Sequence, residues 1–481
     1  MTLFKKLDAD MDHELDRHDP GLTSEVRERR RERNDQIDQS LRRTMRSFTA
    51  RWLPLVISKR EDPAIASQIE EIVRDSWRSA RKDMLRAVNR TSYRSALTLY
   101  LFAQTPIPVA ISEDEELDGI SGPVCIQTAL SQVQKLRERQ QRCHQFDEPP
   151  EPSTLASALT SYAPNPSSTQ AHLAFESRAY WAAVMWDTSS SLTLNLRTSL
   201  TSGLNGGCSE PAWRVARTFL AGSFHPRTEH WRTDGFEVSD EAALQIINGA
   251  NVCKLYVWKN ITSLKEALRE GVDEESVLFV WTALLDSIHI FKTSFRPLLD
   301  SCERRLHFLD QLTRLAWYEL NLQYYMGILL LVNEIETANR SDLISQVAEV
   351  RQDAEQESLN VLKFGIDNTY TIDGPKYDSD TTTGLEASAN LPREPVTASF
   401  VAIDPYPDRV VDSVMLMSKV INREYRQGKI KHGAYSHLSS TLLKAVGELP
   451  QSSRIVQSAQ ENLQRSIHSI DAVFVNDAVV G

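Results

Sequence analysis

Apolar side chains recur at helical spacing along most of the chain. Residues 62–88, 239–295 and 298–336 each place apolar positions three or four apart, which is typical of amphipathic or buried helices. We find no run in which apolar and polar residues alternate, as a half-buried strand requires. The pattern therefore predicts an all-α protein, organised as one large multi-helix domain with an N-terminal arm.

Changes in composition predict four segments. They are a charged Arg/Glu-rich arm at 1–47, a large helical domain at 48–365, a flexible loop at 366–405 and C-terminal helices at 406–481. The loop segment has few apolar residues to bury. The last segment predicts two amphipathic helices, near 407–425 and 433–474, that pack on the large domain.

The arm is open to two interpretations. Between Glu25 and Arg46 it holds eight Arg and five acidic residues, with Ile37, Leu41 and Met45 four apart on one stripe. One interpretation is a solvated helix with Glu–Arg pairs. The other is a nuclear-import or phosphate-contacting patch, although Glu28 and Glu32 interrupt the basic run.

Net charge and cysteine spacing restrict the function classes. A net charge of −11 argues against nucleic-acid binding by the whole chain, because phosphate contacts require a concentrated positive surface. The five cysteines are scattered, which fits a reducing compartment, and no Cys-x-x-Cys pair offers local zinc ligands. His225 and His230 are separated by Pro226 and are not expected to bind a metal. The sequence thus predicts no metal and no cofactor.

Neither a signal peptide nor a membrane span is expected. The N-terminal residues turn acidic at once, and no apolar core follows them. The longest apolar run, 324–332, has nine residues, whereas a bilayer requires about 20. We therefore expect a soluble intracellular protein without membrane contact.

The segment AYWAAVMWDTSSSL, residues 179–192, contains the most unusual local pattern. Trp181, Val184 and Met185 form an apolar stripe, while Ala183 and Trp186 make the opposite side apolar as well. A helix that is apolar on nearly all sides is buried. Asp187 near its end is then either a catalytic acid or a structural residue that needs a partner such as Arg178 or a nearby hydroxyl, since a buried charge must be satisfied.

One constellation suggests an enzyme. Asp342, Ser345 and Glu349 lie at i, i+3 and i+7, so a helix would place three oxygen ligands on one face, as a magnesium-diphosphate site requires. The segment resembles one metal motif of terpene synthases, except that Ser341 stands at its first position. The nearest acidic partner motif, Asp114–Asp118, falls in a predicted loop. The alternative is a capped, solvent-facing helix.

A second resemblance covers more of the chain. SRAYWAAVMWDTSSSLTL resembles the core helix of the middle-homology regulatory domain of fungal binuclear zinc-cluster transcription factors. Arg178, Trp181, Asp187, Ser190 and Leu192 match its pattern. SYRSALTLYLFAQTPIP resembles an earlier helix of the same domain. In this order the segments extend the resemblance over roughly residues 48–340.

The resemblance implies a nuclear regulator of RNA polymerase II transcription, with an all-α regulatory domain and no catalytic residues. Asp187 then becomes structural. The six-cysteine DNA-binding module of that family is absent from this chain, so DNA contact would require a missing module or a partner. Protein partners or a homodimer formed through the arm, and a small-molecule effector, are compatible with this reading. The alternatives are a magnesium-dependent diphosphate enzyme and a helical interaction scaffold.

Overall fold

The computed structural model describes residues 2–18, 23–57, 63–144, 168–200, 211–233, 235–372 and 395–480. Helices fill most of these residues, and the prediction of an all-α protein is confirmed. The N-terminal helices are α1 Thr2–His18, α2 Ser24–Ala50, α3 Leu53–Ile57, α4 Pro63–Val88, α5 Tyr93–Ala103, α6 Glu113–Leu117, α7 Gly122–His144 and α9 Ser168–Leu194.

The central segment contains the longest buried helices and several short π and 3₁₀ turns. Its elements are α11 Pro211–Arg217, η1 Thr218–Phe224, α12 His225–Arg227, η2 Glu229–Arg232, α13 Asp240–Glu270, α14 Glu274–Ile290, η3 Phe291–Phe295, α15 Arg296–Arg305, η4 Leu306–Phe308, α16 Gln311–Thr337, α17 Ser341–Ile344, η5 Ser345–Val347 and α18 Ala348–Asp367. The remaining elements are β1 Thr369–Ile372, β2 Val396–Ser399, α19 Phe400–Ile403, α20 Pro407–Arg426, α21 His432–Glu448 and α22 Arg454–Val480.

Local side-chain chemistry sets the ends of the central helices. Ser239 caps α13 by accepting from the amide of Ala242 at 3.2 Å, and Gly271 ends the helix with a left-handed φ of 63°. Asp273 then caps α14 by accepting from the amide of Ser276 at 2.9 Å. The tight turn reverses the chain, so that α13 and α14 pack against each other.

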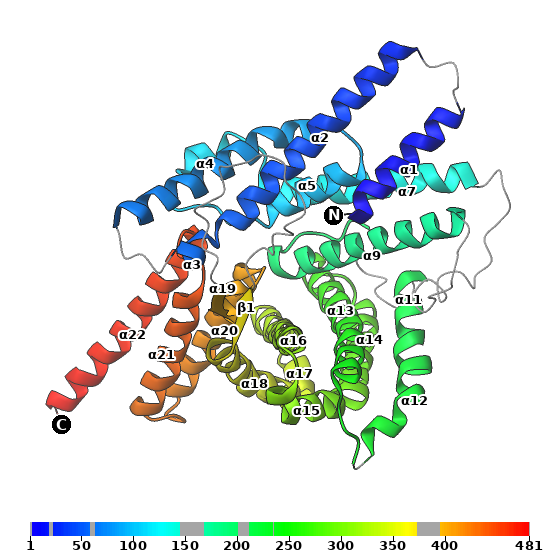
Figure 1. The fold of residues 1–481 in the computed structure, drawn as a ribbon. Coiled ribbons are helices and arrows are strands. Elements are labelled where there is room, and N and C mark those ends of the chain that lie inside the picture. The colour runs from blue at the N-terminus through cyan, green and yellow to red at the C-terminus, as the bar shows by residue number, and fades with distance from the viewer. Residues whose placement is uncertain are drawn as a thin grey trace.

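The larger of two apolar cores, the main core, surrounds α16. This helix is seen end-on at the centre of Figure 1, between α13, α18 and α20, and it contacts all three. Tyr318, Met326 and Ile328 on different faces of α16 are fully buried, which explains why its apolar pattern covers the whole circumference. The main core continues into α14, α15, α21 and α22.

A second apolar core, the N-terminal core, lies above the main core in Figure 1. Helices α1, α2, α4, α5, α7 and α9 contribute to it, and α5 is its most enclosed element. Trp77 of α4, Leu99 of α5 and Leu130 of α7 meet there with almost no exposed surface.

Helix α9 belongs to both cores. Ala179, Ala183 and Trp186 face the N-terminal core, whereas Val184 and Leu192 face the main core. A helix sandwiched between two apolar layers needs apolar residues on opposite faces, and this accounts for the all-round pattern in AYWAAVMWDTSSSL. Met185 is the exception in the predicted stripe, because 42% of it is exposed.

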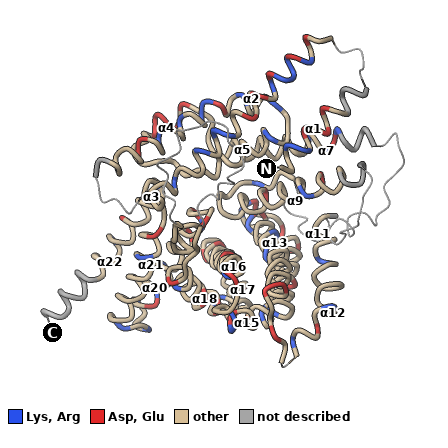
Figure 2. The backbone as a smooth tube through the Cα atoms, viewed as in Figure 1, with Lys and Arg blue, Asp and Glu red and all other residues tan. Residues whose placement is uncertain are grey.

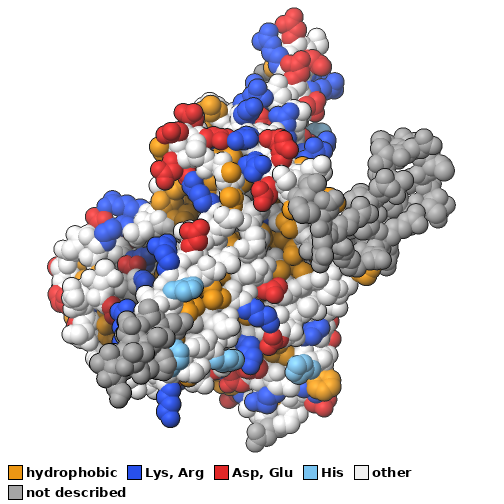
Figure 3. All heavy atoms as spheres, turned by 90° about the vertical axis from the view of Figure 1, so that its left-hand side faces the viewer, with side chains coloured by type: hydrophobic (Ala, Val, Ile, Leu, Met, Phe, Trp, Pro, Cys, Tyr) orange, Lys and Arg blue, Asp and Glu red, His pale blue; other side chains and the backbone are white. Residues whose placement is uncertain are grey.

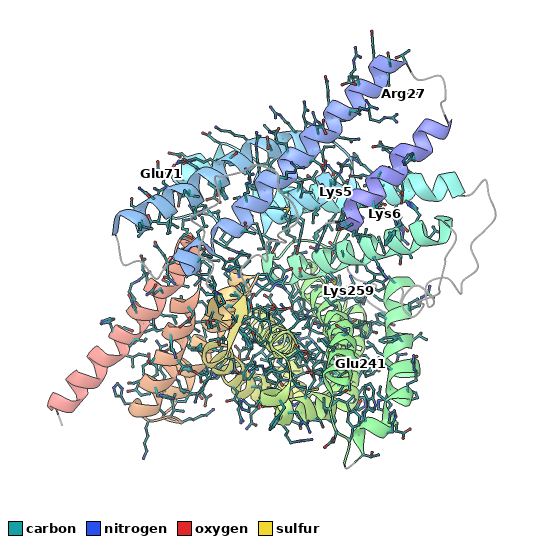
Figure 4. All side chains as sticks on the ribbon, in the orientation of Figure 1. Lys5, Lys6, Arg27, Glu71, Glu241 and Lys259 are labelled. Carbon is teal, nitrogen blue, oxygen red and sulfur yellow. The ribbon has the colours of Figure 1, made fainter. Side chains whose placement is uncertain are left out.

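The arm that we expected at 1–47 is not separate from the rest of the fold, and helix α2 continues past residue 47 to Ala50. Phe4 and Leu7 of α1 and Leu41 of α2 are buried in the N-terminal core, so the stripe predicted on α2 packs inside its own chain. The N-terminal half of α2 remains exposed, and Figure 2 shows positive and negative residues intermixed along it. Arg27 lies at its protruding tip (Figure 4).

The prediction of a flexible loop over 366–405 is wrong at both of its ends. Strands β1 and β2 pair antiparallel, with Thr371 opposite Thr397 and their hydroxyl oxygens 3.0 Å apart, and α19 follows directly. The β-branched residues of TYTI and VTAS favour these extended strands, although the segment is too short to show a period. The middle of the predicted loop, 373–394, lies outside the described residues.

The C-terminal segment forms three helices, α20 to α22, instead of the two that we predicted. The segment 433–474 is broken between Leu449 and Ser453, because Pro450 disfavours helical geometry in the residue before it. The backbone at this break is hydrogen-bonded to the segment that follows α5, and we call this contact the seam. The amide of Val109 donates to the Ser452 carbonyl at 2.8 Å, and that of Arg454 donates to the Ile107 carbonyl at 2.9 Å.

The prediction that no segment could span a membrane overlooked one stretch. The 35-residue helical run Glu274–Phe308 is long and apolar enough by length and composition alone. In the fold it packs against α13, and Trp281, Phe291 and Leu298 from it lie in the main core. A buried core helix has the same composition, and we interpret the run in that way.

Candidate functional site

Asp187 is buried near the end of α9 and holds the segment that follows the helix. Only 2% of the residue is exposed. Its carboxylate accepts from the backbone amides of Ser199 at 2.8 Å and Leu200 at 2.9 Å. These hydrogen bonds satisfy the buried charge, as the sequence analysis required, and they give Asp187 a structural role.

Removal of this carboxylate is expected to destabilise the fold. Asp187→Ala leaves two amides without their charged acceptor, and we expect a loss of about 2–3 kcal/mol in the free energy of unfolding. Asp187→Asn keeps one acceptor oxygen in a similar volume and should lose less. Chemical unfolding of the three proteins tests this order, and equal losses in the two variants would contradict it.

The three side chains of the magnesium alternative at 341–349 interact with separate partners, as the alternative of a capped, solvent-facing segment requires. Asp342 is exposed and pairs with Arg340 at 2.7 Å, and Glu349 is exposed and pairs with Lys292 at 2.6 Å. The hydroxyl of Ser345 donates to the carbonyl of Asp342. The segment is also broken into α17, η5 and α18, so the three side chains do not share one helix face.

The acidic segment at 114–118 is a short helix rather than the predicted loop. Ser112 caps α6 by accepting from the amide of Glu115. Glu115 forms an ion pair with Arg78 at 2.6 Å, and Glu116 pairs with Arg454 of α22. Both acids therefore connect surface elements, and their ion-pair partners differ from those of Asp342 and Glu349.

The histidines and cysteines weighed in the sequence do not assemble a metal site among the described residues. His225 Nδ1 lies 2.7 Å from Ser294 Oγ, while His230 is exposed. Cys125, Cys253 and Cys302 are buried free thiols. In the described ranges, no three His, Cys, Asp or Glu side chains come together as metal ligands.

A group of charged residues, which the sequence analysis did not single out, lies where the two cores meet; Lys254 and Asp404 are buried and the others are half-buried. We call it the interlobe cluster. It comprises Lys254 of α13, Glu319 of α16, Asp404 after α19, and Asp408, Arg409 and Asp412 of α20. The first turns of α20 bring Asp408 and Asp412 onto one face, because they are four residues apart, and Asp404 lies just before the helix begins.

Polar side chains and aromatic rings hold the cations of the interlobe cluster. The ammonium group of Lys254, which is 6% exposed, donates to Gln323 Oε1 at 2.7 Å and to Asn251 Oδ1 at 2.9 Å. The guanidinium of Arg409 lies 3.8 Å from the centre of the Tyr406 ring. Both cations also face Trp258, at 5.0 and 5.6 Å.

The N-terminal core closes the interlobe cluster from above. Tyr100 of α5 stacks on Trp186 of α9 with ring centres 4.1 Å apart, and its hydroxyl interacts with Tyr406. Lys259, another fully buried lysine of α13, lies beneath α9 (Figure 4). Tyr100 of the N-terminal core thus contacts Tyr406, whose ring covers Arg409 of the cluster.

Burial weakens the charges of the interlobe cluster. It raises the pKa of Asp404 to about 7, with further repulsion from Glu319, and raises the pKa of Asp412 to about 7, with repulsion from Asp408. Burial, together with repulsion from Arg409, lowers the pKa of Lys254 to about 7. The cluster thus holds two acids and one base whose pKa values lie near neutrality.

These pKa values predict an unusual pH dependence for Asp404→Asn. The unfolded chain ionises Asp404 from about pH 4, but the folded chain only near pH 7, so ionisation reduces stability across this interval. The asparagine still accepts the amide of Tyr406, which donates to Asp404 Oδ1 at 2.8 Å. We expect the variant to be more stable than the wild type by about 1–2 kcal/mol at about pH 8.

The gain from Asp404→Asn should shrink as the pH falls to about 5, because the folded wild type is then protonated. Chemical unfolding at both pH values measures this difference. Asp353→Asn, at an exposed position of α18, serves as the control and should show no comparable change. A gain that is independent of pH would contradict the assignment.

One sequence signal could have revealed the interlobe cluster. Lys254 and Lys259 stand in the otherwise apolar CKLYVWKNI, and Glu319 stands in AWYELNL. A single charge in a helix that is apolar on all sides must be buried with partners, which is the argument that identified Asp187. The partners themselves come from α19 and α20, far along the chain, and no local pattern connects them.

The chain matches no family model, no curated protein and no solved structure. The resemblance of residues 177–194 to a middle-homology helix therefore rests on the sequence pattern alone.

Proposed function

We propose that the protein is a nuclear transcription regulator, corresponding to the regulatory domain of fungal zinc-cluster factors, which controls RNA polymerase II transcription. The proposal rests on the position of α9 between the two apolar cores. Three of the five matching residues, Asp187, Ser190 and Leu192, are buried, and α9 is the one element whose residues contribute to both described cores. A motif that connects two cores suits a domain whose halves respond to each other.

In this proposal the interlobe cluster is the place where a polar small-molecule effector acts. Buried charges are costly without close partners, and they are retained where they serve recognition or switching. Arg409 lies over the ring of Tyr406, and Glu319 interacts through space with Lys254 and Arg409. A polar molecule that contacts them would change the packing between the two halves.

A tethering experiment tests the proposed function. The full chain is fused to an unrelated DNA-binding module and expressed in a fungal cell with a reporter gene that carries the matching DNA site. We expect reporter output that differs from that of the module alone. Equal output, with the fusion present in the nucleus at the same level as the module, would overturn the proposal.

The role of the interlobe cluster is tested in the same assay. Arg409→Gln should change the reporter output of the fusion, because it removes the cation that faces Tyr406 and Trp258. Arg426→Gln, at the exposed end of the same helix, is the matched control and should behave as the parent fusion. Identical behaviour of the two variants would exclude the cluster as the responsive site.

A further inference from the structure

A small cavity lies at the seam between the N-terminal helices and the turn that precedes α22. Its volume is about 10 Å³, close to the room needed by one water-sized particle. It is lined by Ser47, Arg51, Val73, Trp77, Thr105, Pro106, Pro108, Ser452 and Ser453. The backbone bridge between Pro108 and Ser453 closes one side of it. Figure 3 views the molecule from the side on which α22 lies.

Several polar atoms at this cavity lack protein partners. Ser47 and Ser453 are each 2% exposed, and Arg51 is 3% exposed. The hydroxyls of both serines and the Nε and Nη1 atoms of Arg51 have no hydrogen-bond partner among the described residues. Only Nη2 of Arg51 is used, donating to the Pro405 carbonyl at 2.8 Å. Donors buried in this way require an acceptor in the cavity.

The charge of Arg51 is only partly compensated. Burial lowers its pKa to about 10, so the guanidinium remains charged at neutral pH. The centres of the Phe48 and Trp52 rings lie 4.0 and 4.3 Å from the guanidinium carbon and stabilise its positive charge by cation–π interaction. Asp404 and Asp408 act on it through space, and both also act on Arg409.

Asp404 contributes less charge than a surface carboxylate would. Its pKa of about 7 means that a large part of it is protonated near neutrality. Arg51 therefore lines a cavity together with the unpartnered hydroxyls of Ser47 and Ser453, and the carboxylates nearest to it, Asp404 and Asp408, are shared with Arg409. A water molecule would satisfy the donors, whereas an anion would also neutralise the guanidinium.

We propose that this cavity binds one monatomic anion of chloride type, held by Arg51 and the hydroxyls of Ser47 and Ser453. The volume excludes phosphate, sulfate and carboxylate ligands, which need several times the space. Because Ser47 and Arg51 belong to the N-terminal half and Ser453 precedes α22, the anion joins the two sides of the seam. Binding of chloride should stabilise their contact.

Bromide provides a direct probe of the site in the wild-type chain. Crystals of the full chain grown with sodium bromide in place of chloride should show an anomalous scattering peak between Arg51 and Ser453. A peak of water density without anomalous signal at that place would overturn the proposal. This measurement does not depend on the folding of any variant.

A solution experiment tests the contribution of the anion. The melting temperature of the full chain is measured while sodium chloride replaces sodium gluconate at constant ionic strength. A saturable rise of about 1–2 °C is expected when chloride reaches about ten times its dissociation constant. Arg51→Met should abolish the rise, and Arg46→Met, at an exposed position of α2, which ends just before Arg51, should retain it.

An equal rise in Arg51→Met and Arg46→Met would show that chloride acts elsewhere, and it would overturn the assignment. If Arg51→Met does not fold, the double variant Ser47→Ala, Ser453→Ala removes two of the donors and should weaken the dependence on chloride at least several-fold. These outcomes are independent of the reporter assay, so failure of one proposal leaves the other standing.

Discussion

Replacement of Arg94 by methionine is expected to cost about 3–5 kcal/mol in the free energy of unfolding. The guanidinium donates to Asp8 at 2.6 Å and to Asp38 at 2.9 Å, with only 9% of the side chain exposed. Burial opposes its charge, but the hydrogen bonds to the two carboxylates leave the pKa of Arg94 above its ordinary value. Loss of the cation leaves Asp8 buried without its counter-charge.

Asp8 has a second role that makes the loss large. Its carboxylate also accepts from the amides of Tyr93 at 2.8 Å and Arg94 at 3.1 Å, at the N-terminus of α5. One carboxylate therefore attaches α1 to the start of α5, and Asp38 attaches α2 through the same arginine. Chemical unfolding and limited proteolysis of α1 both measure the effect.

Two further variants make the test of Arg94 specific. Arg42→Met, at an exposed position of α2, should change stability by less than about 0.5 kcal/mol. The double variant Asp8→Asn, Arg94→Met removes the unpaired charge and should be more stable than Arg94→Met alone. A loss in Arg94→Met no larger than that in Arg42→Met would show that the ion pair does not hold α1 in place.

Gly327→Ala is the second substitution for which we expect a large effect, a loss of about 2–4 kcal/mol. A Cβ atom at this position would lie 2.4 Å from Nε1 and 2.8 Å from Cδ1 of Trp258. The indole ring is 1% exposed and packed on all sides, so it has little room to move. Helices α13 and α16 would have to separate.

Gly447→Ala is the matched control for this substitution. Gly447 lies within α21, and a Cβ atom there meets nothing within 4 Å. The change should stabilise the helix by about 0.5–1 kcal/mol, because alanine loses less backbone entropy on folding. Chemical unfolding of both variants gives the two values, and effects of the same sign would contradict the close packing of Trp258 against α16.

The opposite signs expected at Gly327 and Gly447 mark the limit of sequence reasoning for individual residues. Both glycines stand inside helical patterns, and local propensity predicts a gain from alanine at either position. Only the arrangement of α13 against α16 distinguishes them. The same holds for Asp187 and Asp342, which are both acids in helical segments, although one is buried and the other exposed.

Helical periodicity by itself determined the class of the fold and most of its helices. Spacing along 239–295 and 298–336 predicted the long buried helices, and the all-round apolar character of residues 179–192 predicted a buried helix with a satisfied Asp187. These features depend on the side chains of one segment, whose burial follows from the hydrophobic effect alone. The partners of that segment do not enter the argument.

Tertiary structure alone decided which segments meet. It placed α9 between two cores, joined Pro108 to Ser453, and assembled the interlobe cluster from α13, α16 and α20. It also paired β1 with β2 across a stretch that looked featureless in sequence. Such contacts depend on the shapes and charges of distant segments in three dimensions, and a periodicity of three or four residues carries no record of them.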